Sequence, residues 1–513
     1  MKMKRYILLL LTIVFSISSC KKMLEEKPYG VFSDSNYFTT EGDALNALLY
    51  AYDPINNIEY GARFMFNLAD VPTNQYKAYN RGFPNGFYNW DVNTNTEEFL
   101  YFFKYAYLGI SRANSVLTNV VKMKNISEGS RSQFLGEAHF LRAFHYFMLV
   151  RTYGSVPLHA KVVESIDEAG ASYATIEDLY AFIIKDLENA NALLKVSKQQ
   201  GRADKIAAQA LLSKVYLTLA SSKSTGAPGY EWISNENDMY VKAAQYANEV
   251  LTKQNIYGLE PNLLNVYDVD HQRDSREHIF ITSMYRDGKG FEGNFSQLPQ
   301  MFGIGLPVIY ISSSITGGAG VSKVIDNTGC WSYYRVDADF YNSFANNDLR
   351  KKLMVSTIYN ANGSVLANWT PANLNSSNST ENAFFYPFCR KYTDPKSLSN
   401  RTSANLYLMR FAEVALTYAE AVGPTTEGYY WLNKVRERAK LDPLAPGLDV
   451  VNFRKAVWDE LTFELAFEGH GIYELRRTNR VITGITNKTV KQDYAYFYPI
   501  PQRETDLNPK INN

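Results

Sequence analysis

The carboxylates most suggestive of catalysis lie near the end of the chain, on one predicted helix. Glu460, Glu464 and Glu468 recur every four residues and therefore share a face, with His470 close by. Paired carboxylates can hydrolyse glycosidic bonds, but such enzymes usually draw the two groups from separate elements across a cleft. Three arginines follow within reach, namely Arg476, Arg477 and Arg480. Because buried charges are usually paired, we interpret this segment as a structural network of ion pairs.

Other chemistry-bearing patterns are absent from the sequence. It contains no HExxH, no GxSxG, no phosphate-cradling glycine loop followed by lysine, and no CxxC. His139 and His145 are six residues apart on a predicted helix, so they point to nearly opposite faces and cannot share one metal ion. The spacing of Cys330 and Cys389 suggests no metal either, and is compatible with two free thiols or with a disulfide. We therefore expect no catalytic residue, no metal and no cofactor.

The composition indicates a chain that folds around a large core. Of its 513 residues, 46% are hydrophobic and 20% are charged, and the formal net charge is +1. This balance argues against a nucleic-acid partner, because phosphate binding needs concentrated lysine and arginine. The aromatic share is 14%, with 38 Tyr and 6 Trp. Amphipathic rings serve cores and also surfaces that bind sugars or peptides, so composition alone leaves both uses open.

The amino terminus has the order of an export signal. Positively charged residues precede the apolar run 6–17, which is too short to cross a bilayer but suits a signal peptide. The run ends in Ile-Ser-Ser-Cys, which resembles a lipobox whose Cys20 is acylated and becomes the first mature residue. We predict a signal peptide over 1–19 and a lipid-anchored tether over 20–32. An ordinary secretory signal with an incidental cysteine is the alternative.

Helical periodicity recurs on both sides of a central stretch, Phe134–Leu158. This stretch is apolar on two sides of one helix, so it must pack between neighbours, and Gly154 with Pro157 ends it. Small and aromatic residues alternate on two later helices, a pattern that fits tetratricopeptide-like stacking or an irregular bundle. The other predicted helices lie within Ser33–Asp53, with Asp43 as its cap, and over Glu97–Lys122, Ile176–Leu194, Ala203–Ala220, Tyr240–Lys253, Ala404–Val422, Thr425–Lys440 and Val451–Phe467.

Between these helices the character of the chain changes. From about 258 to 403 it is rich in Gly, Ser and Asn clusters, with short strand-like runs such as Ile279–Met284. We interpret this part as a large loop-rich insertion. The predicted fold is mostly α, a single domain over 33–513 whose helical scaffold comprises 33–257 and 404–513.

Three stretches resemble hallmarks of the SusD/RagB family of outer-membrane nutrient-binding lipoproteins. The first is the helix E-A-x-F-L-R-A-x-x-Y-F-x-L-V-R-x-Y-G-x-V-P-L at Glu137–Leu158, and the second is E-L-x-x-E-L-A-F-E-G-x-x-x-x-x-L-R-R at Glu460–Arg477. The third is Tyr-Pro-Ile-Pro at Tyr498–Pro501, followed by Glu504 and Asn508-Pro509. With the lipobox and Leu406–Glu413, the resemblance spans almost the whole chain. Within the second hallmark, His470 stands where the family usually has Arg, and Glu474 where it usually has Asp.

The resemblance implies a right-handed stack of four tetratricopeptide-type helix pairs that supports a variable loop-rich region. Family members are non-enzymatic and capture oligosaccharides, or in some relatives peptides, for a SusC-like TonB-dependent transporter. It further implies lipid anchoring in the outer membrane, facing the cell exterior, although Lys21-Lys22 precede Glu25-Glu26 in the tether. The alternatives are a peptide-binding RagB-like protein, a surface glycoside hydrolase with two carboxylates converging in the insertion, and a structural adaptor that uses its helical groove.

A glycan site can also be sought from the residues. Sugar rings present apolar faces edged by hydroxyls, so a site needs exposed aromatic platforms with Arg, Asn or Asp beside them. Two irregular stretches meet that demand, and SusD-like proteins build their binding face from loops in the same two parts of the chain. The candidates are Tyr79, Asn80, Arg81, Tyr88 and Trp90 before the long helix, and Trp331, Tyr333, Tyr334 and Arg335 in the insertion. Any one ring is as compatible with packing on the scaffold. As a set, they predict that at least one of Trp90 and Trp331 is a platform.

Overall fold

The structure is a computed structural model that describes residues 37–77, 84–284, 294–306, 308–316, 320–325, 329–397, 400–508 and 510. Its long helices are α3 (Glu41–Asn56), α6 (Glu97–Val120), α7 (Glu128–Tyr153), α9 (Ile176–Leu193), α10 (Lys205–Thr225), α11 (Glu236–Leu251), α15 (Phe411–Val422), α16 (Thr426–Arg438) and α17 (Val450–Glu464). Its short helices are α4 (Phe64–Ala69), α5 (Asn85–Tyr88), α8 (Ile166–Ala169), α12 (Leu298–Phe302), α13 (Ala338–Ser343), α14 (Ser379–Ala383), α18 (Gly471–Arg477), α19 (Val481–Gly484) and α20 (Gln502–Leu507).

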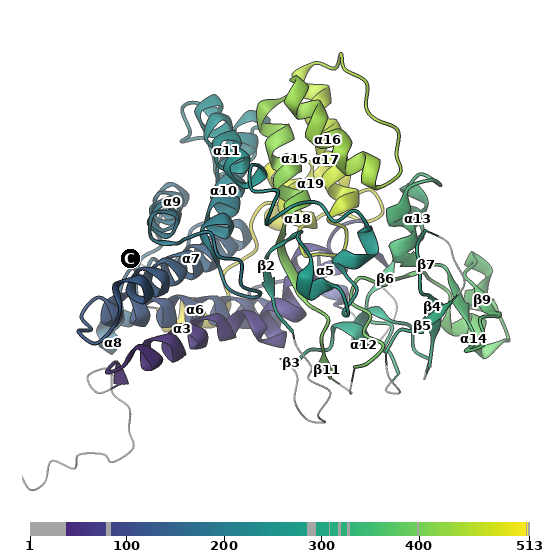
Figure 1. Ribbon diagram of the computed structural model, residues 1–513, viewed down its shortest axis with the longest axis horizontal. Coiled ribbons are helices and arrows are strands. Elements are labelled where there is room, and N and C mark those ends of the chain that lie inside the picture. The colour runs from purple at the N-terminus through teal and green to yellow at the C-terminus, as the bar shows by residue number, and fades with distance from the viewer. Residues whose placement is uncertain are drawn as a thin grey trace, which may run out of the picture.

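The long helices pack against one another in chain order. α3 contacts α6, α6 contacts α7, and α7 contacts α9. α9 contacts α10, α10 contacts α11, α11 contacts α15, and α15 contacts α16. In Figure 1 this succession runs from the purple and blue helices on the left to the green helices at the top. A stack in which each helix meets its sequence neighbours is the tetratricopeptide-like arrangement, so the predicted mostly α fold class is confirmed.

Helix α7 is buried on almost every side, as its two apolar stripes predict. It ends at Gly154, whose φ of 76° lies in the left-handed region that glycine adopts easily. On α6, Gly109 lets α7 approach closely: a Cβ there would lie 2.1 Å from His145 Nε2. His145 Nδ1 lies 3.0 Å from the Tyr60 hydroxyl, whereas His139 Nδ1 contacts Asp186 at 2.7 Å. The two histidines therefore face different partners.

Two local predictions need correction. Thr40, not Asp43, caps α3, and the Asp43 carboxylate accepts a hydrogen bond from the Thr40 N–H at 2.7 Å, so the two form a capping box. The predicted helix over Ala404–Val422 begins only at Phe411, because Leu406–Arg410 forms the buried strand β12. A short, wholly apolar run has no periodicity that separates a buried strand from a helix.

The insertion carries most of the strands. A four-stranded antiparallel sheet in the order β5-β4-β8-β9 stands at the right of Figure 1, over a small apolar core of its own. The other strands form two-stranded antiparallel pairs, β1–β6, β10–β7, β11–β3 and β12–β2. The strands are β1 (Tyr76–Lys77), β2 (His278–Thr282), β3 (Asn294–Phe295), β4 (Tyr310–Ser312), β5 (Val321–Lys323), β6 (Arg335–Val336), β7 (Met354–Val355), β8 (Thr357–Tyr359), β9 (Val365–Asn368), β10 (Phe388–Cys389), β11 (Arg401–Thr402) and β12 (Leu406–Arg410).

Within the described ranges, none of the helices combines the length and the apolar character that a bilayer crossing requires. The central helix and the second hallmark share one hydrophobic core, which includes Phe144, Leu461 and Phe467. These segments are therefore packed in one body, as the sequence predicts.

Candidate functional site

The two predicted ligand-binding stretches meet at a short strand pair. Tyr76 of β1 pairs with Val336 of β6, and Lys77 pairs with Arg335. We call this pair, with the flanking residues Gln75 and Asp337, the β1–β6 junction. Tyr79, Asn80 and Arg81 follow β1 directly but lie outside the described residues. The junction therefore brings the segment that leads to these three residues against the segment that contains Trp331.

The junction is also anchored from the carboxyl-terminal part of the chain. The Gln75 carbonyl accepts the Asp337 N–H at 2.9 Å, and its side-chain Oε1 accepts the Phe467 N–H at 2.7 Å. Five residues earlier, the buried Asp70 carboxylate accepts the N–H groups of Gly469 and Gly471 at 2.8 and 2.9 Å. Burial raises the pKa of Asp70 to about 7, although these two backbone donors oppose the shift.

Trp331 is the predicted platform that the structure leaves exposed. Its side chain retains 46% of its accessible surface, while its backbone N–H donates to the Gln300 carbonyl at 2.7 Å. Three residues on, the backbone of Tyr334 is held by the Met301 carbonyl at 2.9 Å. The indole is thus carried on a backbone segment held against α12, so little backbone ordering is needed when a ligand stacks on it.

Trp90 and Tyr334 do not fit the predicted role. Trp90 is 2% exposed, and its indole N–H donates to the Pro72 carbonyl at 3.1 Å. Tyr334 is fully buried, and its hydroxyl donates to Asn67 Oδ1 at 2.7 Å. A ring whose faces are covered cannot stack on a sugar, so both prove to be core residues. Large aromatic side chains are common both in cores and at ligand-binding surfaces, so the sequence around these two rings could not show which role each has.

The other predicted residues that the structure describes are buried or half-buried. The buried Arg335 guanidinium stacks on the Phe385 ring at 4.2 Å, and Tyr88 is buried with Lys488 Nζ 3.8 Å from its ring centre. Tyr333 is half-buried and meets Tyr334 edge to face at 4.9 Å. These side chains can support the shape of the site.

Sequence reasoning missed several polar neighbours of the junction. Burial disfavours the charged form of Lys77, but Tyr88, Tyr386 and Asp337 more than offset this, so the pKa of Lys77 is raised. Burial lowers the pKa of Lys488 to about 7, and its ammonium donates to the Thr73 carbonyl at 2.6 Å. These residues come from segments hundreds of positions apart. No signal in the sequence joins them, because the pairing of β1 with β6 is what places them together.

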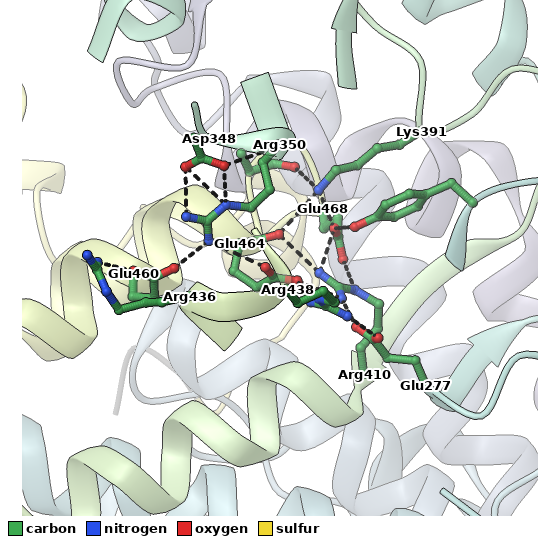
Figure 2. A network of polar contacts seen from close by, with 12 residues as sticks. Glu277, Asp348, Arg350, Lys391, Arg410, Arg436, Arg438, Glu460, Glu464 and Glu468 are labelled. Carbon is green, nitrogen blue, oxygen red and sulfur yellow. Dashed lines mark hydrogen bonds and ion pairs between the residues drawn. The ribbon is translucent and has the colours of Figure 1, made fainter. Parts of the chain in front are cut away.

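The glutamates that first suggested catalysis belong to a buried ion network, shown in Figure 2. Arg410 reaches Glu464 at 3.1 Å, Glu468 at 2.7 Å, and Glu277 as well. The other pairs are Arg438 with Glu464 (2.6 Å) and with Glu277, Lys391 with Glu468 (2.5 Å), Arg350 with Asp348 (2.8 Å) and with Glu460 (2.6 Å), and Arg436 with Glu460 (3.0 Å).

This network joins the insertion to the scaffold. Arg350 and Lys391 come from the insertion, whereas Glu464 closes α17 and Arg410 ends β12. Burial disfavours the charged carboxylate of Glu464, but Arg438 and Arg410 outweigh it, so the pKa of Glu464 lies below its ordinary value. Paired with Arg or Lys and closed to solvent, these glutamates cannot work as an acid and a base on a substrate, as the sequence pattern predicts.

The two departures from the second hallmark are accommodated. Glu474 forms an ion pair with Arg477 at 2.6 Å, and Arg477 also pairs with Glu420 at 2.7 Å. His470 Nδ1 lies 3.0 Å from the Lys214 ammonium, and burial together with that charge holds the pKa of His470 well below its ordinary value. Glu474, which is one methylene longer than the usual Asp, thus still forms an ion pair with an arginine.

Metal-ligating and thiol side chains are the other groups of the structure that could carry chemistry. Among the residues that it describes, no group of three His, Cys, Asp or Glu side chains is placed to hold a metal ion. Cys330 and Cys389 are both free and buried, which resolves the choice that the sequence left open. Burial raises the pKa of each thiol to about 12, so neither is a reactive thiolate at neutral pH.

Family comparisons account for both halves of this architecture. A family profile described as "Starch-binding associating with outer membrane" matches residues 24–217, and one described as "SusD family" matches residues 260–513. The chain belongs to the SusD/RagB family. Its matched regions cover the insertion, all three hallmarks and most of the helical stack, while the end of α10 and all of α11 lie between them.

Relatives of this SusD/RagB protein extend over nearly its whole length. The SusD-like protein P25 of Formosa agariphila is 26% identical over 540 residues, which cover 97% of this chain and 96% of the relative. A solved SusD superfamily protein of Parabacteroides distasonis has a TM-score of 0.74 at 22% identity, covering 92% of this chain and 98% of its own. The surface glycan-binding protein A of Bacteroides thetaiotaomicron, solved with laminarihexaose, has a TM-score of 0.66 at 19% identity, with coverages of 92% and 98%.

Proposed function

We propose that this protein binds an oligosaccharide at the cell surface, with Trp331 as the aromatic platform, and passes it to a SusC-like TonB-dependent transporter. The observation that carries the proposal is the exposed Trp331 indole, held on a fixed segment beside the β1–β6 junction. An exposed ring supplies the apolar face, and polar groups of the junction can direct the hydroxyls. The glycan-bound relative supports the choice of ligand class.

In this proposal the protein captures its ligand without catalysing a reaction. The buried ion network supports that view, because the carboxylates most suggestive of hydrolysis are already paired with Arg and Lys. The packed stack supplies a rigid frame, while loops at its edge can vary to fit different ligands. Lipid anchoring through Cys20, which lies outside the described residues, would keep the protein beside its transporter.

The platform is tested by replacing Trp331 with alanine. A glycan array first selects a neutral oligosaccharide that the parent binds, and titration calorimetry then measures its affinity for the variant. We expect Trp331→Ala to weaken binding by about 10- to 100-fold, corresponding to roughly 1.4–2.8 kcal/mol, the range of a buried aromatic contact. Tyr430→Ala is a matched control, because Tyr430 is also 46% exposed but lies on α16. Equal affinities of Trp331→Ala and the parent would exclude Trp331 as the platform.

The anchor requires a separate experiment. Mass spectrometry of the membrane fraction should find an acylated Cys20 as the first residue, and protease treatment of intact cells should shave the protein from the surface. Cys20→Ala should prevent acylation, because the thiol that would carry the lipid is gone. An unmodified amino terminus at another residue would refute the anchor without affecting the ligand site.

A further inference from the structure

A second concavity lies in the helical scaffold. It is a cleft of about 610 Å³ between α6, the segment after α7 that includes Pro157 and His159, α8 and α20. None of its lining residues belongs to the β1–β6 junction or to the segment of Trp331. In Figure 1 α8 lies at the left of the molecule, whereas β6 lies in its right-hand half. We call this concavity the scaffold cleft; its volume is in the range typical of small-molecule sites, roughly 300–1,000 Å³.

The floor of the scaffold cleft is apolar and fixed. The rings of Phe103 and Tyr107, one turn apart on α6, lie 4.6 Å centre to centre, and Tyr107 meets His159 edge to face at 5.9 Å. The Tyr107 hydroxyl donates to the Pro157 carbonyl at 2.6 Å. A ring tethered in this way keeps its position without a ligand, so an apolar face could dock on it at little entropic cost.

The rim of the scaffold cleft is cationic. Lys104 Nζ lies 5.5 and 5.3 Å from the ring centres of Tyr101 and Tyr105. Among the described residues, no carboxylate forms an ion pair with it. The Lys161 ammonium makes a long, solvent-exposed contact of 3.8 Å with Glu168. Within the described part of the chain, the Arg503 guanidinium makes no ion pair or hydrogen bond.

Negative charge is scarce at the same place. Glu504 is the one carboxylate among the described residues that line the scaffold cleft, and burial raises its pKa, which favours its neutral form. Its Oε1 already accepts the Asn508 amide at 3.1 Å. Burial lowers the pKa of His159, and the nearby positive charge of Lys510 lowers it further. The balance of charge therefore attracts an anion to a site that has an apolar floor.

We propose that the scaffold cleft is a second binding site for an acidic oligosaccharide, one whose sugar rings carry carboxylates. The apolar face of such a ring fits the Phe103 and Tyr107 floor, and its carboxylate fits the Lys104 and Arg503 rim. A concave site of this volume suits a short ligand better than a protein surface, which needs a broader and flatter area. The inference rests on the proposed function only in choosing a sugar as the ligand.

The test uses trigalacturonate as the acidic probe and maltotriose as the neutral one, with calorimetry on the purified full-length protein. We expect trigalacturonate to bind, maltotriose not to bind at this site, and trigalacturonate affinity to fall as salt rises. Lys104→Gln with Arg503→Gln should weaken trigalacturonate binding by about tenfold or more, because two charge-assisted contacts are lost. The double variant Lys434→Gln with Lys455→Gln removes the same charge from α16 and α17 and should leave the affinity unchanged.

Two further variants separate this site from that of Trp331. Ser111→Trp places a large side chain on the exposed rim of the scaffold cleft and should block trigalacturonate without disturbing the core. Trp331→Ala should leave trigalacturonate binding intact. If Trp331→Ala abolished it while the Lys104 and Arg503 pair of substitutions did not, the acidic ligand would belong to the first site and this inference would fail. Absence of trigalacturonate binding by the parent would also overturn it, and the neutral-glycan test of Trp331 would be unaffected.

Discussion

Arg410 is the residue whose removal should most disturb the buried ion network. In Arg410→Met, three carboxylates lose one partner each, yet none is left without a cation. Glu468 keeps Lys391 at 2.5 Å, Glu464 keeps Arg438 at 2.6 Å, and Glu277 keeps Arg438. Breaking one side of a buried pair typically costs about 3–5 kcal/mol. Because Arg410 is fully buried and its partners are only partly compensated, we expect a loss of unfolding free energy in that range.

Denaturant unfolding followed by tryptophan fluorescence measures this loss as a shift of the midpoint. The control is Lys434→Met, which breaks an exposed pair with Glu437 at 3.1 Å and should change the unfolding free energy by about 1 kcal/mol or less. Adding Glu468→Gln to Arg410→Met should recover part of the loss, because one carboxylate no longer needs a second cation. A midpoint for Arg410→Met no lower than that of Lys434→Met would refute the view that these charges depend on one another.

Three other outcomes follow from the packing and the pKa shifts. Phe144→Ala should lower the unfolding free energy by about 3–5 kcal/mol, since Phe144 is 4% exposed; an unchanged midpoint in denaturant would show that its ring adds no packing energy. Gly109→Ala should cost about 1–3 kcal/mol or more, because the new Cβ would lie 2.1 Å from His145, whereas Gly129→Ala, with nothing within 4 Å, should be neutral or slightly stabilising in the same assay. The pKa of Glu464 is below its ordinary value of 4.5 in the folded state, so its contribution to stability is complete above that pH and is lost as the pH falls below it. Thermal midpoints should therefore differ little between pH 7 and 5 and should fall with increasing slope from pH 5 through 4 to 3, and a flat profile below pH 5 would contradict the assignment.

The scaffold could be predicted from sequence because helical periodicity is a local property. The range Glu97–Lys122 anticipated α6, which ends at Val120, and Ile176–Leu194 anticipated α9, which ends at Leu193. The error at Leu406–Arg410 arose where the partner strand β2 lies far away in the sequence. A strand of five consecutive buried residues takes its identity from that partner, not from a pattern of its own.

The candidate site was predicted only in part for a related reason. Composition and spacing identified segments rich in Tyr, Trp and Arg, and the structure brings these segments together at the β1–β6 junction. They did not reveal which rings are covered, because the burial of Trp90 depends on Pro72 and on the Tyr498 ring, 6.4 Å away. Exposure is a property of the assembled fold, so Trp331 and Trp90 could not be separated from sequence.

The anchoring of the β1–β6 junction determines when the proposed binding face can form. Gln75 forms hydrogen bonds with Asp337 and Phe467, and Asp70 forms them with Gly469 and Gly471. Two residues near the start of the chain are therefore held by partners hundreds of positions later. Closing such long loops is slow, and the contacts stabilise the fold only after both partner segments have been synthesised. While the chain is being synthesised, the helical stack can form pair by pair from its amino-terminal end. The proposed ligand face would be among the last parts to form, so a chain truncated before residue 467 would carry a helical scaffold without a working platform.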